Sequence, residues 1–467
     1  MTTPKQMVSG DVATRSTPST PWGWLTLCTA GLVAAAFIYY WVIWRSWHNF
    51  VGGLDDTPVL FCDFVRHYYT TARQILTTAT PSPGYYYSTF FAIILIPFGR
   101  LSEDAAVWLW GATQILTAVL LAALAGRHLL ARGRDCYGLH LLLFLLCLPV
   151  LSNFKWGQVS LLMVLCAAAA LYSYQANRKV MAGVVLALGA AIKYYPGLFI
   201  IYFLFKRDVR VVASFAIAVA LFSVGVPWAV LGADRSHEFQ YGVNRTVGAA
   251  RDVLFRDINS QYFANVIYRQ TQRGAKEVSP LQLPDPGKKN TLGLFFDALK
   301  GQLPGRPGPL FYRLRYTGYG LFAFNLLALA FLIRARPRDE APLAFALLFL
   351  SLPLIVETSW PHYFVYLPLC QVILYAAVRD GPRLWAKVLA IPLLAASMVL
   401  SSTVFFHILG DWRVYSRYGM LFAADALLLV TLHLHLLALW LARRTTRTMP
   451  APHALAAAQP ASVPSGC

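Results

Sequence analysis

Long apolar stretches alternate with short polar connections along most of this chain. An apolar run of roughly 17–25 residues is long enough to cross the hydrocarbon core of a bilayer as a helix, and a helix satisfies its own backbone hydrogen bonds there. The pattern predicts an all-α integral membrane protein of about twelve spans: 24–44, 104–125, 137–152, 158–174, 180–192, 196–205, 211–230, 316–333, 341–356, 363–378, 388–406 and 419–442.

Two connections, residues 45–103 and 231–315, are much longer than the others. Helices that only had to be joined would need a few residues in each connection, so we expect function in these two loops. In the first, the apolar stretch 89–98 is too short to span and is expected to be interfacial or re-entrant. In the second, amphipathic tracts are expected around 236–272 and 291–300.

Within FCDFVRHYYTTARQIL (61–76), residues 64–76 have a helical period, and we expect this helix to lie flat at the membrane surface. Asp63 then occupies its N-cap or first turn. As a cap it would stabilise the helix by about 1 kcal/mol; alternatively, its carboxylate acts as a general base on a sugar or lipid hydroxyl. Asp55 and Asp56, in the turn-like VGGLDDTP, are nearby alternatives. The apolar face is Phe64, Val65, Tyr68, Tyr69, Ala72, Ile75 and Leu76, with Arg66, Thr70, Arg73 and Gln74 largely opposite.

Composition supports the membrane interpretation. Of the 467 residues, 57% are hydrophobic and 13% charged, with a mean hydropathy of +0.53, which excludes an ordinary soluble globule and a disordered chain. Residues 23–445 form the expected transmembrane domain. The polar ends 1–22 and 446–467 are expected to be disordered cytoplasmic tails.

The net charge of +19 raises the question of a nucleic-acid partner. With both termini in the cytoplasm, 19 of the 40 Lys and Arg residues lie on the inner side, and 13 of the 21 outer ones lie in 231–315. Long loops translocate largely regardless of charge, so the bias of the short loops sets the orientation. We therefore expect a multi-pass plasma-membrane protein with both termini cytoplasmic, in contact with membrane lipids, and no nucleic-acid partner.

Four polar sets fall at the predicted outer helix ends, on the side of Asp63. Interfacial anchoring by Trp, Tyr and Lys accounts for such sets. Lys193, beside the proline that divides two helices, is also suited to binding a phosphate. The sets are Asn153, Lys155 and Gln158; Lys193, Tyr194 and Tyr195; Asn259, Gln261, Asn265 and Arg269; and Glu357, Trp360, His362 and Tyr363.

Motifs of soluble enzymes are not found. The sequence has no Walker loop, GxGxxG, HExxH or cysteine pair at metal spacing, and we expect neither a metal site nor a cofactor. The first long loop has no D-x-D motif, which disfavours a nucleotide-sugar donor held by a metal.

Taken in order, six runs resemble the polyprenol-phosphate-mannose-dependent mannosyltransferases of the GT-C superfamily. They span about residues 60–370. The runs are DFVRHYYTTARQIL, YSTFFAIILIPFGRLS, WGQVSLLMVL, AAIKYYPGLFIIYFLFKR, DINSQYFANVIYR and SWPHYFVYL. His67, Thr89 and Ser160 depart from the family pattern, which bears on the substrate more than on catalysis.

The resemblance implies a metal-independent, inverting transfer of a hexose, mannose first, from a polyprenyl phosphate to an extracytoplasmic glycolipid or glycan. Asp63 would be the general base, and His362 matches a histidine near the family's active site. Lys193 lies in the run assigned to the donor phosphate. Further candidates for donor or substrate binding are Tyr195, Gln158, Arg66, Asn259, Gln261 and Arg269.

A transporter or flippase of lipid-linked glycans is the alternative function. Neither internal repeat halves nor charged residues in paired broken helices support it. A third interpretation, a non-catalytic envelope scaffold, requires Asp63 to be merely a helix cap.

Overall fold

The computed structural model describes residues 22–46, 60–78, 80–130, 133–254, 257–271, 309–337 and 339–448. These residues form helices and no strand; an isolated bridge joins Cys147 and Ser402. The all-helical prediction is therefore confirmed. Asp55, Asp56 and the predicted tract 291–300 lie outside the described residues.

The first half of the bundle is built from hairpins of apolar helices. Neighbouring helices pack closely, α1 on α5, α5 on α8, α8 on α9 and α9 on α11. The elements are α1 (Trp22–Ser46), η1 (Phe64–Tyr69), α2 (Thr70–Gln74), α3 (Thr89–Ile94), α4 (Ile96–Gly99), α5 (Glu103–Leu130), α6 (Arg134–Leu146), α7 (Leu148–Trp156), α8 (Ser160–Gln175), α9 (Lys179–Ile192), η2 (Tyr195–Phe199), α10 (Ile200–Phe205), α11 (Val209–Ala220), η3 (Leu221–Gly225) and α12 (Val226–Leu231).

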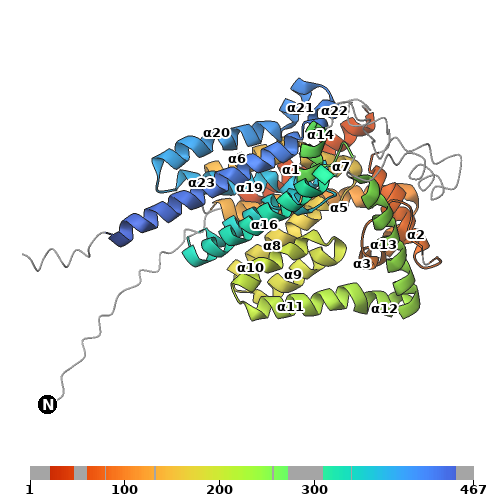
Figure 1. The fold of residues 1–467 in the computed structure, drawn as a ribbon. Coiled ribbons are helices and arrows are strands. Elements are labelled where there is room, and N and C mark those ends of the chain that lie inside the picture. Colours follow the sequence, from red (N-terminus) through yellow and green to blue (C-terminus); the bar gives the residue numbers. More distant parts are fainter. Residues whose placement is uncertain are drawn as a thin grey trace, which may run out of the picture.

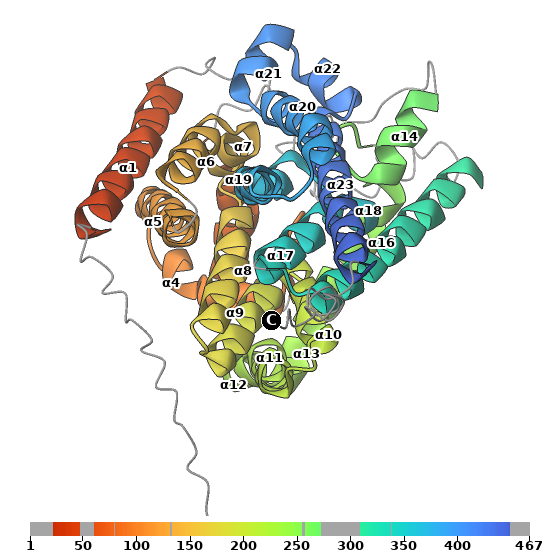
Figure 2. The same cartoon turned by 90° about the vertical axis from the view of Figure 1, so that its left-hand side faces the viewer.

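The second half surrounds a central helix, α19. Figure 2 shows α19 almost end-on, and α5, α6, α17, α20 and α23 pack against it. The remaining elements are α13 (Ala233–Leu254), α14 (Phe263–Thr271), α16 (Pro309–Ala335), α17 (Glu340–Leu350), α18 (Leu352–Ile355), η5 (Pro361–Tyr366), α19 (Leu367–Arg379), α20 (Leu384–Leu400), α21 (Thr403–Leu409), α22 (Trp412–Arg417) and α23 (Met420–Thr448).

Twelve spans are not confirmed. Among the described residues, five helical stretches are long and apolar enough to cross a membrane: Glu103–Gly126, Val209–Leu231, Pro309–Ala335, Pro361–Arg379 and Met420–Arg444. A sixth candidate, α7 with α8, is bent by 119°. Other predicted spans are shorter or broken. At two of the breaks a proline follows, which cannot donate a backbone hydrogen bond and disfavours helix before it. Pro149 follows the α6–α7 break and Pro353 the α17–α18 break.

The first long loop folds back onto the bundle. Figure 1 shows α2 and α3 at one end of the helices, beside α13 from the second long loop. The apolar stretch 89–98 is confirmed as too short to span, since it forms the two short helices α3 and α4. The tract 236–272 forms two helices, α13 and α14, with residues 257–262 between them.

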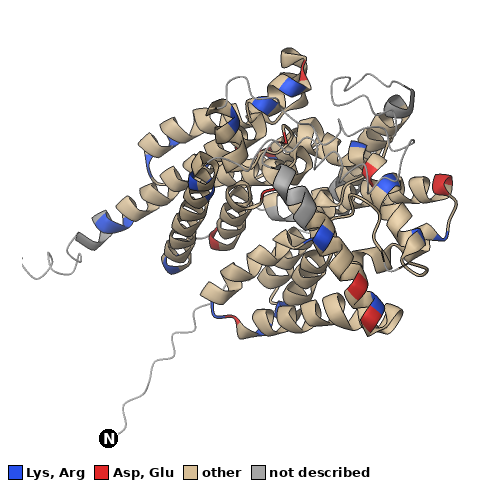
Figure 3. Ribbon diagram, turned by 45° about the vertical axis from the view of Figure 1, so that its right-hand side comes forward, with Lys and Arg blue, Asp and Glu red and all other residues tan. Residues whose placement is uncertain are grey.

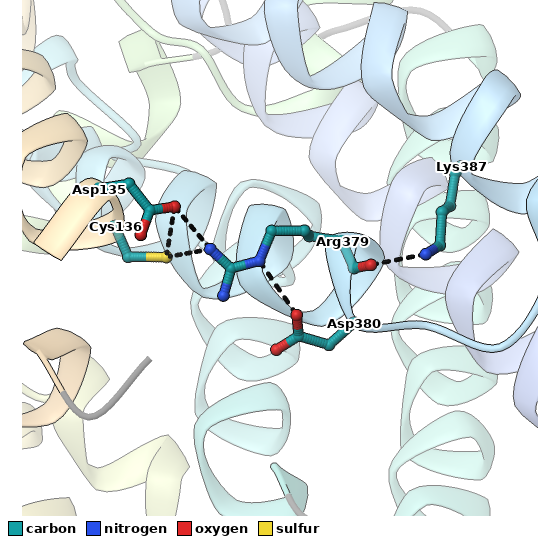
Figure 4. A network of polar contacts seen from close by, with 5 residues as sticks. All are labelled: Asp135, Cys136, Arg379, Asp380 and Lys387. Carbon is teal, nitrogen blue, oxygen red and sulfur yellow. Dashed lines mark hydrogen bonds and ion pairs between the residues drawn. The ribbon is translucent and has the colours of Figure 1, made fainter. Parts of the chain in front are cut away.

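Charges lie mainly near helix ends and in connections, while the middles of the helices are mostly tan in Figure 3. One such end joins α6, α19 and α20 (Figure 4). Arg379 pairs with Asp135 at 2.5 Å and with Asp380 at 3.0 Å, and Lys387 donates to the Arg379 carbonyl at 2.6 Å. Exposed pairs of this kind each contribute about 0–1 kcal/mol. They fasten the bundle at the end of α19 that is remote from η5.

Candidate active site

Asp63 lies in the first turn of a continuous helix that runs through η1 and α2. Its backbone is already helical (φ −69°, ψ −34°), and among the described residues its side chain makes no capping hydrogen bond to this helix. The Oδ2 atom instead accepts a hydrogen bond from Nε2 of Gln158. The first-turn position is as predicted, but capping does not account for this carboxylate.

An elbow between α7 and α8 presents Gln158 to Asp63. Gly157 ends α7 in the left-handed region (φ 67°), which glycine adopts without steric cost. A Cβ there would lie 3.0 Å from Cβ of Phe61 and 3.0 Å from Nε1 of Trp110. The carbonyl of Gly157 accepts from Trp110 at 2.9 Å. The chain therefore turns tightly against η1 just before Gln158.

Two phenols orient the Gln158 amide. Its Oε1 accepts from Tyr68 at 2.9 Å and from Tyr87 at 2.7 Å, and the two phenol oxygens are 2.6 Å apart. Each phenol has one proton: Tyr87 donates to Oε1, and Tyr68 can donate either to Oε1 or to the Tyr87 oxygen. In both cases Oε1 faces the phenols and the amide nitrogen is directed at Asp63. We call Asp63, Tyr68, Tyr87, Gln158 and Lys193 the Asp63 cluster.

Lys193 joins this cluster from the end of α9. Its backbone is extended (φ −144°, ψ 126°), and η2 starts two residues later with Pro196 in its first turn. The Nζ atom donates to the Tyr87 hydroxyl at 3.3 Å. It also lies 3.9 Å from the ring centroid of Tyr363, 4.9 Å from that of Tyr87 and 6.0 Å from that of Tyr195. Such rings attract a cation.

Burial changes the acid–base properties of both charged groups. Desolvation raises the pKa of Asp63, opposed by His67, the Gln158 hydrogen bond, Lys193 and Arg66. Desolvation lowers the pKa of Lys193 to about 7, opposed by the Asp63 charge. Both groups therefore titrate closer to neutrality than in water, which suits proton transfer and reversible anion binding.

His362 is buried beside Lys193 at the start of η5. Its ring centroid lies 5.3 Å from that of Tyr363 and 5.9 Å from that of Trp360. It is 5% exposed, and its Nε2 atom has no hydrogen-bond partner among the described residues. A buried, unsatisfied ring nitrogen is costly in a finished core and is consistent with a site that receives a polar ligand.

The predicted candidates divide into two groups. Asp63, Gln158, Lys193, Tyr195 and His362 lie together, and the exposed Arg66 borders them. Asn259, Gln261 and Arg269 belong to a second network, which ties the second long loop to α22 and adjoins His362 through Asp257 and Trp360.

Arg269 and its neighbours are engaged in that network. The guanidinium donates to the carbonyls of Asp257 at 2.7 Å, Ser260 at 2.8 Å and Ser416 at 3.2 Å. Gln261 donates to the Ser416 carbonyl at 3.1 Å. These contacts give Arg269 and Gln261 a structural role, and ligand binding by either of them stays a prediction.

Sequence reasoning missed Asp257 and Tyr86. Asp257 is 1% exposed and accepts from Nε1 of Trp360 at 2.5 Å; desolvation raises its pKa to about 6. Burial raises the pKa of Tyr86 to about 12, and Asp257 and Asp63 both add to the rise, so Tyr86 is near both acids. The signals were the acid that opens DINSQYF and the run of three tyrosines, 85–87.

Metal-binding chemistry has no evident place in the part of the chain that the structure describes. No group of three or more His, Cys, Asp or Glu residues there could hold a metal ion.

Comparisons with known proteins identify the family. Residues 85–356 match glycosyltransferase family 87. The match includes Gln158 and Lys193, whereas Asp63 and His362 lie outside it. No solved structure matches the chain.

A curated relative is the polyprenol-phosphate-mannose-dependent alpha-(1-2)-phosphatidylinositol pentamannoside mannosyltransferase of Mycolicibacterium smegmatis. It is 31% identical over 194 residues, which are 41% of this chain and 45% of the relative. The chain thus matches rather less than half of the relative's length. The resemblance drawn from the six runs is confirmed, and because the family match covers more than half of it, this chain belongs to glycosyltransferase family 87.

Proposed function

We propose that this protein is a membrane hexosyltransferase that moves mannose from a polyprenyl phosphate to a glycolipid or glycan on the extracytoplasmic side. The relative's name specifies a polyprenol-phosphate-mannose donor. The single observation that carries the proposal is that Asp63, an acid without a capping role, and the cation Lys193 belong to one hydrogen-bonded cluster, joined through Gln158 and Tyr87.

In the proposed reaction, the acceptor hydroxyl attacks the anomeric carbon of the donor sugar. Asp63 takes the hydroxyl proton as the new C–O bond forms, and the bond between the anomeric carbon and the phosphate oxygen breaks with inversion. The polyprenyl phosphate leaves with the bonding electron pair. Gln158 occupies Oδ2 of Asp63, which leaves Oδ1 to receive the proton.

Lys193 is proposed to bind the donor phosphate. The leaving phosphate gains negative charge in the transition state, and a fixed cation in a desolvated site stabilises that charge strongly. His362, with its unsatisfied Nε2, is proposed to donate to the phosphate or to a sugar hydroxyl. Neither step requires a metal or a cofactor.

The direct test is sugar transfer by purified protein in nanodiscs. A panel of labelled polyprenyl-phosphate sugars is incubated with membrane lipid extract, and label is sought in the extract. We expect transfer from polyprenyl phosphate mannose, and much less from the other sugars. Absence of transfer from every donor contradicts the proposal.

The alternative, a transporter or flippase of lipid-linked glycans, predicts a different result in proteoliposomes. It would move the intact lipid-linked sugar between leaflets without forming a new glycosidic bond. The enzyme would instead release free polyprenyl phosphate in step with the glycosylated product.

A further inference from the structure

A continuous chain of hydrogen bonds links the cation of the site to its carboxylate. Nζ of Lys193 lies 3.3 Å from the Tyr87 hydroxyl, that hydroxyl lies 2.7 Å from Oε1 of Gln158, and Nε2 of Gln158 donates to Asp63. Tyr68 lies beside the chain and donates to the same Oε1, whereas the hydrogen bond from Lys193 goes to Tyr87. The links come from four separate segments of the sequence.

The protonation state of Lys193 determines which atom is the donor in each hydrogen bond of this series. An ammonium group has three donors and no acceptor, so a charged Lys193 donates to the Tyr87 oxygen. The single Tyr87 proton is then directed to Oε1 of Gln158, which turns the amide nitrogen toward Asp63. A neutral Lys193 amine could accept that proton instead, and the Tyr87 hydrogen bond to Gln158 would be lost.

We propose that Tyr87 and Gln158 couple the cation that receives the donor phosphate to the orientation of the Asp63 carboxylate. A bound phosphate keeps Lys193 charged, so Lys193, Tyr87 and Gln158 each go on donating toward Asp63. Oδ2 of Asp63 then stays occupied, and Oδ1 faces the acceptor. Tyr87 is thus a positioning residue that keeps the base oriented while Lys193 is charged, a state that a bound donor phosphate favours. This inference rests on the proposed function, because it takes the phosphate site to be at Lys193.

Other groups also act on Lys193 and must be held constant in a test. Asp63 faces it from η1, Tyr195 from η2, and His362 and Tyr363 from η5. Among these, Asp63 supplies the negative charge that favours the ammonium form. Tyr87→Phe leaves all of these groups in place and keeps the aromatic ring; it removes the hydroxyl link to Lys193 and Gln158, and with it the acceptor of Tyr68.

The test measures binding of sugar-free polyprenyl phosphate to the protein in nanodiscs over a pH series. Loss of binding on the alkaline side reports deprotonation of Lys193. In Tyr87→Phe the ammonium loses an acceptor, so its charged form is less stable and the alkaline limb should move to lower pH. Tyr68→Phe is the matched control: it removes the other phenol, which contacts both Gln158 and the Tyr87 hydroxyl, but it leaves the hydrogen bond from Lys193 to Tyr87, so the limb should stay unchanged.

Single-turnover transfer gives the second readout. We expect Tyr87→Phe to slow transfer at saturating donor roughly tenfold, the size of one hydrogen bond in a charged network. Gln158→Met removes the hydrogen bonds between Tyr87 and Asp63. It should slow transfer, while the loss of polyprenyl phosphate binding at alkaline pH stays as in the wild type. Thermal melting checks that each variant is folded.

Opposite results overturn the coupling. One such result is an alkaline limb of binding that shifts equally in Tyr87→Phe and Tyr68→Phe, and another is a limb that shifts in neither variant. Either result means that Tyr87 only fills space or only orients the amide. If the wild type binds polyprenyl phosphate and Tyr87→Phe shifts the alkaline limb as expected, but no sugar is transferred, the proposed function alone is contradicted. Failure of the wild type to bind polyprenyl phosphate contradicts both.

Discussion

At the scale of single residues, Asp63 and Lys193 have pKa values displaced toward each other. Burial raises the pKa of the carboxyl and lowers that of the ammonium to about 7. The proposed reaction needs Asp63 ionised to accept a proton and Lys193 charged to hold a phosphate. The two requirements are met together only within a limited pH window.

Transfer should therefore show a bell-shaped pH profile in kcat/KM, which reports the free enzyme. The acid limb reflects protonation of Asp63, and activity falls on the alkaline side as Lys193 loses its proton above a pH of about 7. In kcat the alkaline limb should move upward, because a bound phosphate stabilises the ammonium form. A flat alkaline side in kcat/KM would show that Lys193 does not have this role.

Lys193→Arg tests whether Lys193 causes the alkaline fall in kcat/KM. A guanidinium stays charged throughout the accessible pH range, so the alkaline limb should disappear even if the overall rate falls. Persistence of the same limb in this variant would assign it to another group.

At the scale of secondary-structure elements, the α7–α8 elbow fixes the position of Gln158. Gly157→Ala places a Cβ in a left-handed conformation, 3.0 Å from Phe61 and Trp110. Strain of this kind costs about 1–3 kcal/mol, and displacement of Gln158 should also lower transfer. Melting temperature and transfer rate check both effects.

Gly138→Ala is the control for that variant. Gly138 lies within α6, and a Cβ added there would have no described atom within 4 Å outside its own helix backbone and chain neighbours. Alanine in a helix interior is favoured over glycine by about 0.5–1 kcal/mol, so stability should rise or stay unchanged. Equal losses in both glycine variants would contradict the role given to the elbow.

The segment 257–271, which includes α14, allows a second prediction at this scale. Arg269 donates to carbonyls of its own loop and of α22, so Arg269→Gln should lower the melting temperature and leave the affinity for polyprenyl phosphate nearly unchanged. Lost affinity at an unchanged melting temperature would instead support the phosphate-binding role considered from the sequence.

Local patterns predicted the elements better than the network between them. The helix around 64–76, with Asp63 in its first turn, follows from periodicity; Phe64, Tyr68 and Ala72 of its predicted apolar face are buried, whereas Leu76 of that face is exposed. Tyr87 and Asp257 were not identified, because their partners Gln158 and Trp360 are 71 and 103 positions away. Hydropathy could not show which apolar stretches proline and glycine divide into short, bent helices.

At the scale of the whole molecule, the bundle has two chemically different ends. Helices α8 and α9 start and finish at the Asp63 cluster and join each other at residues 176–178. At about 1.5 Å per residue, that turn lies roughly 20 Å away. The Arg379 network of Figure 4 lies at the far end of α19 from His362.

The proposed orientation places the cluster end outside the cell. In a variant with Cys28 and Cys467 replaced by alanine, a cysteine at Ser102 should react with a membrane-impermeant maleimide in intact cells. A cysteine at Asn177, in the α8–α9 turn, should react only after permeabilisation. Both positions are exposed, and the reverse labelling pattern would place the cluster on the cytoplasmic side.

The measurement that tests the central claim most directly is the single-turnover rate of mannose transfer in nanodiscs by wild type, Asp63→Asn and Asp411→Asn. Asp411 caps α22 by accepting from the Arg413 amide at 2.7 Å, and asparagine caps nearly as well. We expect wild-type transfer from Asp411→Asn and a loss of about 10²–10⁴-fold from Asp63→Asn, the usual contribution of a general base. Full activity in a folded Asp63→Asn variant would contradict the assignment of Asp63 as the base.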